Sequence, residues 1–354
     1  MKYYFHRLAL LALAFTLLSS CDDDDRPSPS PNIKFRQIGL DNLKVYELTL
    51  YGSDSLFAAT NDGIYVKDIT SDHPFVQIGL DGRNVLDLVV FTEDHIIATT
   101  GNRGFTSDTP GIHETLNGGT SWEKYDFGDG DNEESAHSLS MHPSIAGTVY
   151  GTGSTVVAKS ENYGKTWEVV WGNWGGFASG TSVAEINPFQ QTDLWYGGQG
   201  GIENGYLGFL RNEQPAKQWD DLVDNPTVAV ELAFANHGNH IFAGFEGALM
   251  KTPNNGDTWK QVIDGHTNGL RFFYGIQTSN SRQGHVYAGG WLKGVDEQEL
   301  IIYVSRDSGD SWEPKNFADE KSGGIYSMKV ISQGGRDKVF VGLDGGGVYE
   351  MEVQ

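Results

Sequence analysis

The stretch S-R-D-S-G-D-S-W, Ser305 to Trp312, has three looser copies earlier in the chain, which end at Trp122, Trp167 and Trp259. Counted back from the tryptophan, each copy has Ser or Thr at minus seven, Asp or Asn at minus five, Gly at minus three and Ser or Thr at minus one. An Asp or Asn side chain can bond the amides of its own turn, and Gly accepts a left-handed backbone. The repeat therefore predicts four hairpin turns of one kind, each followed by a strand that begins at the tryptophan.

We expect these turns to be structural clips and not ligand sites. The residues assigned to them are Asn117, Gly119 and Trp122, then Asn162, Gly164 and Trp167, then Asn255, Gly256 and Trp259, and finally Asp307, Gly309 and Trp312.

A second motif predicts the number of units. It consists of a hydrophobic pair, a small residue and usually Gly or Thr, and its seven copies start at Leu56, Ile96, Val149, Leu194, Ile241, Val286 and Val339. Each copy follows an alternating, strand-like segment and precedes a third strand. Spacings of 40 to 53 residues with strand and turn signals are typical of propeller blades. We predict an all-β fold: a single seven-bladed propeller of four-stranded blades over residues 33–354, with six blades as the alternative.

The two ends of the repeat region suggest how the ring closes. The seventh unit reaches Gln354 after only three strands. Residues 35–40, F-R-Q-I-G-L, nearly copy residues 75–80, F-V-Q-I-G-L, which form the outer strand of the first unit. We expect the N-terminal strand to pair with the last blade and remove its open edge.

Composition excludes several classes of function. The chain has 354 residues and a formal net charge of -22, which repels phosphate backbones, so we expect no nucleic-acid partner. It has one cysteine, so it forms no intrachain disulfide. The acidic run D-G-D-N-E-E at residues 129–134 lacks the glycine register of a calcium loop. We expect neither a metal nor a cofactor.

The first 32 residues predict export and anchoring. Lys2 and Arg7 precede an apolar run from Leu8 to Leu18. The sequence L-S-S-C that follows resembles the lipobox of bacterial lipoproteins, which implies cleavage of residues 1–20 and lipidation of Cys21 by diacyl and acyl chains such as palmitate. An ordinary signal peptide with an incidental cysteine is the alternative.

Residues 21–32 then form an acidic and Pro/Ser-rich tether. The four aspartates at 22–25 resemble a surface-export signal of some Gram-negative bacteria, although a solvated spacer would look the same. We expect an outer-membrane lipoprotein that is exposed at the cell surface and attached to the membrane through Cys21.

The four turns and the V-Y-x-G strands resemble the Asp-box (BNR) repeat propellers, over residues 35–354. That group includes sialidases, xyloglucan-active glucanases, sortilin-type ectodomains and photosystem II stability factors. The resemblance implies repeat architecture but not activity, because both enzymes and non-enzymes carry these boxes.

The resemblance offers few catalytic residues. No Arg in the chain is followed by Ile-Pro, as the sialidases would require, and Asn61 stands where the glucanases have an aspartate, with Asp62 next to it. Glu47, Asp87 and Glu231 occupy similar positions on the expected innermost strands. If they reach one funnel, two of them can act as general acid and base; alternatively they bond neighbouring strands or line a wet channel.

Aromatic residues suggest a binding face opposite the turns. Trp171, Trp174 and Phe177 lie in the connection between the third and fourth units, and Phe273, Tyr274 and Trp291 belong to the sixth. Such rings form platforms for sugars or for a protein partner, although they can equally pack between blades. We therefore expect a non-catalytic, surface-anchored propeller that binds a glycan or a protein. The alternatives are a glycoside hydrolase and an assembly or scaffold factor for an envelope complex.

Overall fold

The computed structural model describes residues 34–101, 108–131, 133–176, 180–235, 239–266 and 269–353. Cys21, the leader and the acidic tether lie outside these residues, so their predicted roles stay predictions. Within the described ranges the chain forms strands and turns but no helix, and hence no helix that is long and apolar enough to cross a membrane.

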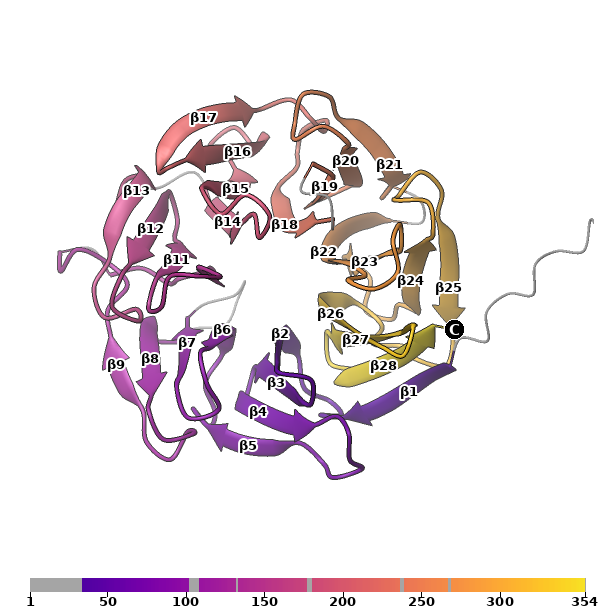
Figure 1. The fold of residues 1–354 in the computed structure, drawn as a ribbon, viewed down its shortest axis with the longest axis horizontal. Coiled ribbons are helices and arrows are strands. Elements are labelled where there is room, and N and C mark those ends of the chain that lie inside the picture. Colours follow the sequence, from indigo (N-terminus) through magenta and orange to yellow (C-terminus); the bar gives the residue numbers. More distant parts are fainter. Residues whose placement is uncertain are drawn as a thin grey trace, which may run out of the picture. The chain divides into compact units, whose positions relative to one another are not determined.

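The strands form seven four-stranded antiparallel sheets around a central axis (Figure 1). The predicted all-β, seven-bladed propeller is confirmed. We number the blades 1 to 7 from the innermost strands β2, β6, β10, β14, β18, β22 and β26.

The strand bounds follow the chain in order. Blades 1 and 2 contain β2 (Val45–Tyr51), β3 (Ser55–Thr60), β4 (Gly63–Asp68), β5 (Val76–Gly79), β6 (Val85–Val90), β7 (Ile96–Thr100), β8 (Gly111–Thr115) and β9 (Glu123–Tyr125). Blades 3 and 4 contain β10 (Ser138–Met141), β11 (Val149–Thr152), β12 (Val156–Ser160), β13 (Glu168–Gly172), β14 (Gly180–Ile186), β15 (Asp193–Gln199), β16 (Gly205–Arg211) and β17 (Gln214–Trp219). Blades 5 and 6 contain β18 (Ala229–Phe234), β19 (Ile241–Phe245), β20 (Ala248–Thr252), β21 (Lys260–Asp264), β22 (Leu270–Thr278), β23 (Val286–Lys293), β24 (Leu300–Ser305) and β25 (Glu313–Phe317). Blade 7 contains β26 (Ile325–Gln333), β27 (Arg336–Leu343), β28 (Val348–Val353) and, from the other end of the repeat region, β1 (Lys34–Gly39).

The N-terminal strand closes the ring as expected. In Figure 1, β1 runs along the outer edge of β28, and the two strands pair with Phe35 opposite Met351. Phe35 stacks on Phe317 of blade 6 with ring centroids 5.4 Å apart, and Arg36 Nε donates to Glu350 Oε1 at 2.7 Å. The closing strand is therefore held by backbone pairing, by an aromatic contact and by an ion pair.

The hydrophobic core is divided among the interfaces between blades. Between blades 1 and 2, for example, Phe57 and Ile64 pack with Leu88 and Ile96, all at most 2% exposed. Trp122, which follows the first repeated turn, packs against the same cluster, and its indole N–H donates to the carbonyl of Ile78 at 3.3 Å. The tryptophans of the repeat thus serve the blade interfaces.

The four repeated turns share one set of hydrogen bonds. In the second turn the Ser160 hydroxyl donates to Asn162 Oδ1 at 2.9 Å and accepts from the Gly164 amide at 2.8 Å, while the Thr166 amide donates to Asn162 Oδ1 at 3.0 Å. The same three bonds occur in the other turns, among Thr115, Asn117, Gly119 and Ser121, among Thr252, Asn254, Gly256 and Thr258, and among Ser305, Asp307, Gly309 and Ser311.

One assignment within the turns is corrected. In the third turn Asn254 makes these bonds, and not Asn255 as we expected. Asn255 occupies the next position, where the backbone is left-handed with φ of 53°, and its Nδ2 donates to Gln190 Oε1 at 3.5 Å. The position five before the tryptophan, and not the neighbouring asparagine, supplies the clip.

Replacing Gly119 by Ala should destabilise the fold more than replacing a glycine with open space around it. Gly119 has φ of +89°, and a Cβ there would lie 2.0 Å from the carbonyl oxygen of Ile78 in blade 1. Gly82, with φ of +70° and no neighbouring atom within 4 Å, is the matched control. We expect Gly82→Ala to lower the free energy of unfolding by roughly 1–2 kcal/mol and Gly119→Ala by about 3 kcal/mol or more, measured by urea denaturation. Equal losses would contradict the close approach of the two blades.

Candidate functional site

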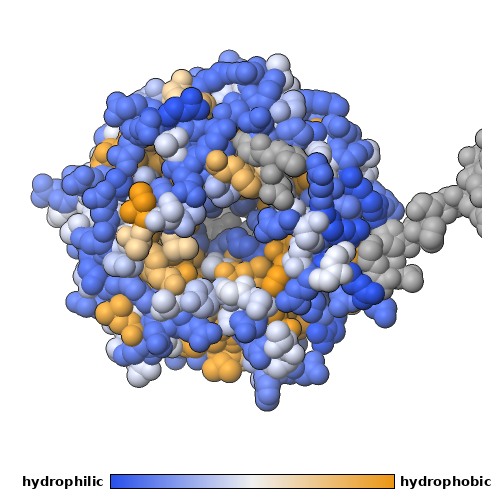
Figure 2. Space-filling view, in the orientation of Figure 1, coloured by the Kyte–Doolittle hydropathy of each residue, from blue (hydrophilic) through white to orange (hydrophobic). Residues whose placement is uncertain are grey.

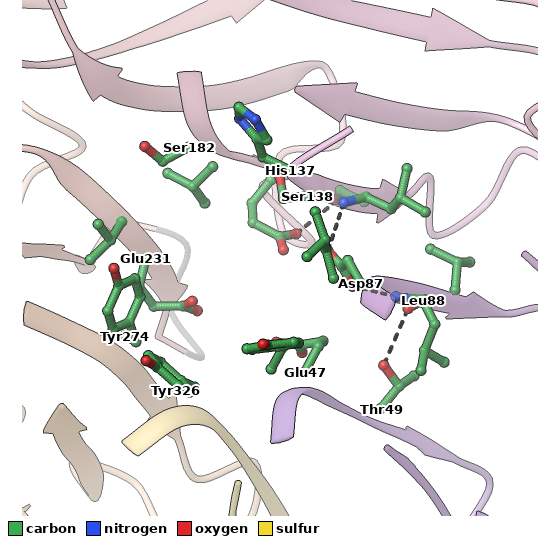
Figure 3. Close-up of a pocket in the computed structure, with 18 of the residues that line it drawn as sticks. Glu47, Thr49, Asp87, Leu88, His137, Ser138, Ser182, Glu231, Tyr274 and Tyr326 are labelled. Atoms are coloured by element: carbon green, nitrogen blue, oxygen red, sulfur yellow. Dashed lines mark hydrogen bonds between the residues drawn. The ribbon is translucent and has the colours of Figure 1, made fainter. Parts of the chain in front are cut away.

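The innermost strands of all seven blades line one cavity on the propeller axis, with a volume of about 600 Å³. Figure 2 shows the corresponding hollow at the centre of the ring, bordered by both hydrophobic and hydrophilic side chains. Figure 3 shows its lining in close-up, and we refer to this cavity as the axial channel.

A β-bulge near the start of the innermost strands determines which side chains enter the channel. In blade 1 the pairing jumps from Val45 to Glu47, and in blade 7 it jumps from Ile325 to Ser327. The residues inside these bulges, Tyr46 and Tyr326, line the channel. A bulge inserts one residue and re-aims its side chain. Repeated bulges thus bring one side chain to the axis in six of the seven blades; the others so placed are Leu86, Ser182, Val230 and Tyr274. In blade 3, β10 pairs with β11 without a bulge.

A short polar side chain directly after the bulge, or at the start of β10, which has no bulge, connects neighbouring blades. Asp87 Oδ2 accepts the amide of Leu139 in blade 3 at 2.7 Å, and Asp87 Oδ1 accepts the amide of Leu88 at 2.6 Å. The hydroxyl oxygens of Ser138 and Ser327 accept the amides of Ala184 and Leu48 in the next blade, at 3.3 and 3.0 Å. Asp and Ser at this position act as clips around the axis.

Glutamate at the same position behaves differently because it is one methylene longer than aspartate. Glu47 forms an ion pair with Lys329 across the junction of blades 7 and 1, with Nζ and Oε1 2.6 Å apart. Glu231 of blade 5 points into the channel (Figure 3). Within the described residues it has no hydrogen bond or ion pair.

The channel holds more acid than base. The described lining contains the carboxylates of Glu47, Asp87, Glu185 and Glu231 but only one Lys or Arg, Lys329. Burial raises the pKa of Glu185 to about 7, although its Oε2 accepts the Ser140 hydroxyl at 2.7 Å. Burial also raises the pKa of Asp87, with a further contribution from the charge of Glu47, and it raises the pKa of Glu231. Lys329 keeps a raised pKa because Glu47 and Glu231 outweigh the opposing effect of its burial.

Three tyrosine rings line the channel, those of Tyr46, Tyr274 and Tyr326. We call these three, together with Phe272 and Trp291, which pack on Tyr274 and Tyr326, the mouth cluster. Ring centroids lie 5.6 Å apart for Tyr274 and Tyr326 and 5.9 Å apart for Tyr46 and Tyr326, while Trp291 stacks on Tyr326 at 6.3 Å. Trp291 Nε1 donates to Asp344 Oδ2 at 2.9 Å, which fixes the indole. The cluster lies toward the propeller face opposite the four repeated turns, since Tyr46 and Tyr326 are near the starts of their strands.

The structure brings several of the predicted residues together. Glu47, Asp87, Glu231 and Tyr274 line the axial channel, and Trp291 belongs to the mouth cluster. Sequence reasoning missed Tyr46, Glu185, Tyr326 and Lys329. These residues lie in segments whose alternating pattern predicts strands, but the sequence does not show the bulge that shifts this alternation.

Other predicted binding residues lie away from the channel. Trp171 packs between blades 3 and 4, with its ring 4.6 Å from that of Tyr196, and Trp174 contacts Phe127 edge to face at 5.0 Å. Both follow the alternative reading, packing between elements. Phe177 lies outside the described residues.

Phe273 as a binding residue and Asp62 as a catalytic candidate are corrected. Phe273 is fully buried in the blade core, because the bulge between Phe272 and Gly275 turns Tyr274 and not Phe273 toward the axis. Asp62 lies in the turn between β3 and β4, where its carboxylate accepts the amide of Gly82 at 3.0 Å and the hydroxyl of Tyr65 at 3.2 Å. It stabilises this loop and does not line the axial channel.

Metal binding finds no support in the part of the chain that the structure describes. No group of three or more His, Cys, Asp or Glu side chains there is placed to hold a metal ion.

Comparisons with known proteins identify the fold. No family model matches the chain, and no curated protein matches its sequence. Similar solved structures include a GH74 xyloglucanase from Xanthomonas campestris, with a TM-score of 0.67 and 13% identity over 90% of this chain and 53% of that enzyme. They also include YCF48 bound to a D1 peptide, at 0.63 and 13% over 91% and 97%, and virginiamycin B lyase from Staphylococcus aureus, at 0.65 and 9% over 91% and 99%.

These likenesses show a seven-bladed β-propeller and nothing more specific. The chain spans about half of the xyloglucanase, and its neighbours include a hydrolase, a lyase and a peptide-bound protein. Function must therefore be argued from the axial channel itself.

Glu185 should make stability depend on pH. Its pKa rises on folding from 4.5 to about 7, so the folded state holds this proton more tightly than the unfolded state. The Glu185 side chain contributes most favourably to the free energy of unfolding below about pH 4.5, and its contribution becomes less favourable as the pH rises to about 7. Relative to wild type, Glu185→Gln should gain stability over this window, by at most about 3 kcal/mol. Urea unfolding at pH 4.5 and pH 8 measures the difference.

The control for this experiment is Glu168→Gln, on the exposed surface of outer strand β13. It should show the same pH dependence as wild type. If Glu185→Gln also parallels wild type, the burial of the Glu185 carboxylate is contradicted.

Proposed function

We propose that the protein is a non-catalytic binding protein that takes part of a glycan or of a protein partner into the axial channel. The observation that carries this proposal is the mouth cluster, three of whose rings line a cavity of about 600 Å³. Small-ligand sites are concave, have volumes of this order and combine aromatic walls with a few convergent polar groups.

Two of the four carboxylates in the lining are held in ways that favour binding over catalysis. Asp87 is held by two backbone amides and Glu47 by the ammonium of Lys329. Groups fixed in this way connect blades and set the charge of the channel. The Tyr and Trp rings, in contrast, offer apolar faces with polar tips, which suit both sugar rings and peptide side chains.

We further propose that the propeller is tethered to the outer membrane and exposed at the cell surface. The support is the L-S-S-C sequence ending at Cys21 and the acidic run behind it. Cys21→Ser should move the protein from the membrane fraction to the soluble fraction and abolish labelling with palmitate. Unchanged fractionation would remove the anchor from the proposal.

Tyr326→Ala should weaken binding at least tenfold, because Tyr326 contacts three other rings of the mouth cluster. The measurement is binding of the full chain to immobilised glycans and extracellular proteins, followed by titration of whichever binds. Phe189→Ala is the control: Phe189 is 45% exposed in the connection between β14 and β15, on the face that carries the repeated turns. Equal loss in both variants would contradict a site at the mouth.

A glycoside hydrolase remains the second candidate, favoured by the raised pKa values of Glu185 and Asp87 beside other carboxylates. Release of reducing sugar by the full chain, lost in Glu231→Gln, would establish hydrolysis and overturn the non-catalytic proposal.

A further inference from the structure

We propose that the axial channel binds a positively charged side chain of a protein partner, an arginine guanidinium or a lysine ammonium, with Glu231 as its principal anion and the tyrosines of the mouth cluster as its wall. This inference rests on the proposed function and selects, among its ligands, a protein segment with a basic residue.

Residues near the start of the innermost strands differ in whether they bond a neighbouring blade. Asp87 and Ser327 after their bulges, and Ser138 at the start of β10, bond the next blade, and Glu47 bonds Lys329. Glu231 differs from these four residues, because it has no hydrogen bond or ion pair in the part of the chain that the structure describes. Within the described residues Glu231 does not bond another blade, and its carboxylate faces the open cavity (Figure 3).

The second step is the charge balance of the lining. Lys329 is engaged by Glu47 at 2.6 Å, which leaves Asp87, Glu185 and Glu231 without a second ammonium or guanidinium in the described lining. An anionic ligand would have to approach these carboxylates, whereas a cationic one would compensate them. The acidic chain as a whole also attracts basic partners over a longer range.

The third step is the aromatic wall. Tyrosine rings attract ammonium and guanidinium groups that lie over their faces. The mouth cluster already holds one cation from this chain, since Lys293 Nζ lies 5.6 Å from the ring centre of Phe272 and 2.8 Å from Glu246 Oε1. Inside the channel Tyr274 and Glu231 again combine a ring with a carboxylate in one lining (Figure 3), but there no basic group of the described residues has an ion pair with that glutamate.

The size of the channel favours a side chain on a longer ligand over a small free amine. About 600 Å³ is typical of sites for ligands much larger than a single ammonium group. The flanking backbone of a peptide would fill the remaining space beside the mouth cluster.

The arriving cation would replace protons. Burial raises the pKa of Asp87, Glu185 and Glu231, so binding a cation should release protons and strengthen as these groups ionise. The other titratable groups that line the channel are Tyr46, Glu47, His137, Tyr274, Tyr326 and Lys329.

Calorimetric titration of the full chain with the peptide Ac-Gly-Gly-Arg-Gly-Gly-amide tests the proposal. The matched peptide carries citrulline, which has nearly the shape of arginine but no charge. We expect the arginine peptide to bind at least tenfold more tightly than the citrulline peptide. Glu231→Gln should remove this preference, whereas Glu299→Gln, an exposed residue outside the channel, should keep it.

The outcomes separate this inference from the proposed function. Equal binding of the two peptides, or an undiminished preference in a folded Glu231→Gln protein, would overturn the cation site. If Tyr326→Ala still abolished binding of a glycan, the proposed function would survive that result. Free arginine binding as tightly as the peptide would overturn the protein partner as the source of the cation. Should Glu231→Gln fail to fold, Glu185→Gln serves as the second variant, with at least a threefold loss of preference expected and an unchanged preference counting against the site.

Discussion

The pairing of β1 with β28 is the constraint on which the rest of the structure depends. Without it, blade 7 would have three strands and an open edge, and the junction between blades 7 and 1 would lose its outer support. The same junction places Lys329 beside Glu47 and Ser327 beside the amide of Leu48 at the axis. Closure at the rim and the arrangement of the channel are therefore linked: the ring has to be complete before seven innermost strands can face one another.

The channel owes its character to a second constraint, the bulge near the start of the innermost strands. One extra residue reverses the alternation of the strand, so that neighbours exchange roles between core and axis. Short polar side chains after the bulge connect blades, and longer ones reach the cavity. A scaffold built in this way can change its ligand by exchanging a few residues while the hydrophobic interfaces between blades stay intact.

The sequence predicted the architecture of the fold, but only some of the residues of the site. Seven repeats and the near-copy of residues 75–80 at 35–40 predicted the blade number and the closing strand, because both are periodic features. The distinction between Phe273 and Tyr274 was not predictable, since it depends on a bulge that leaves no clear mark in the sequence. Trp171 looked like an exposed platform but packs on Tyr196, a residue of another blade that is distant in sequence. The ion pair of Lys329 with Glu47 was not predictable either, because it forms only where the last blade packs against the first.

The axial channel, lined by Glu231 and the tyrosines of the mouth cluster, is the proposed cation site. A crystal structure of the full chain with the arginine peptide bound tests it most directly. We expect the guanidinium inside the channel, hydrogen-bonded to the Glu231 carboxylate, with the peptide backbone beside Tyr274 and Tyr326. A peptide bound on the outer connection near Trp171 and Trp174, with the channel left unoccupied by it, would contradict the account.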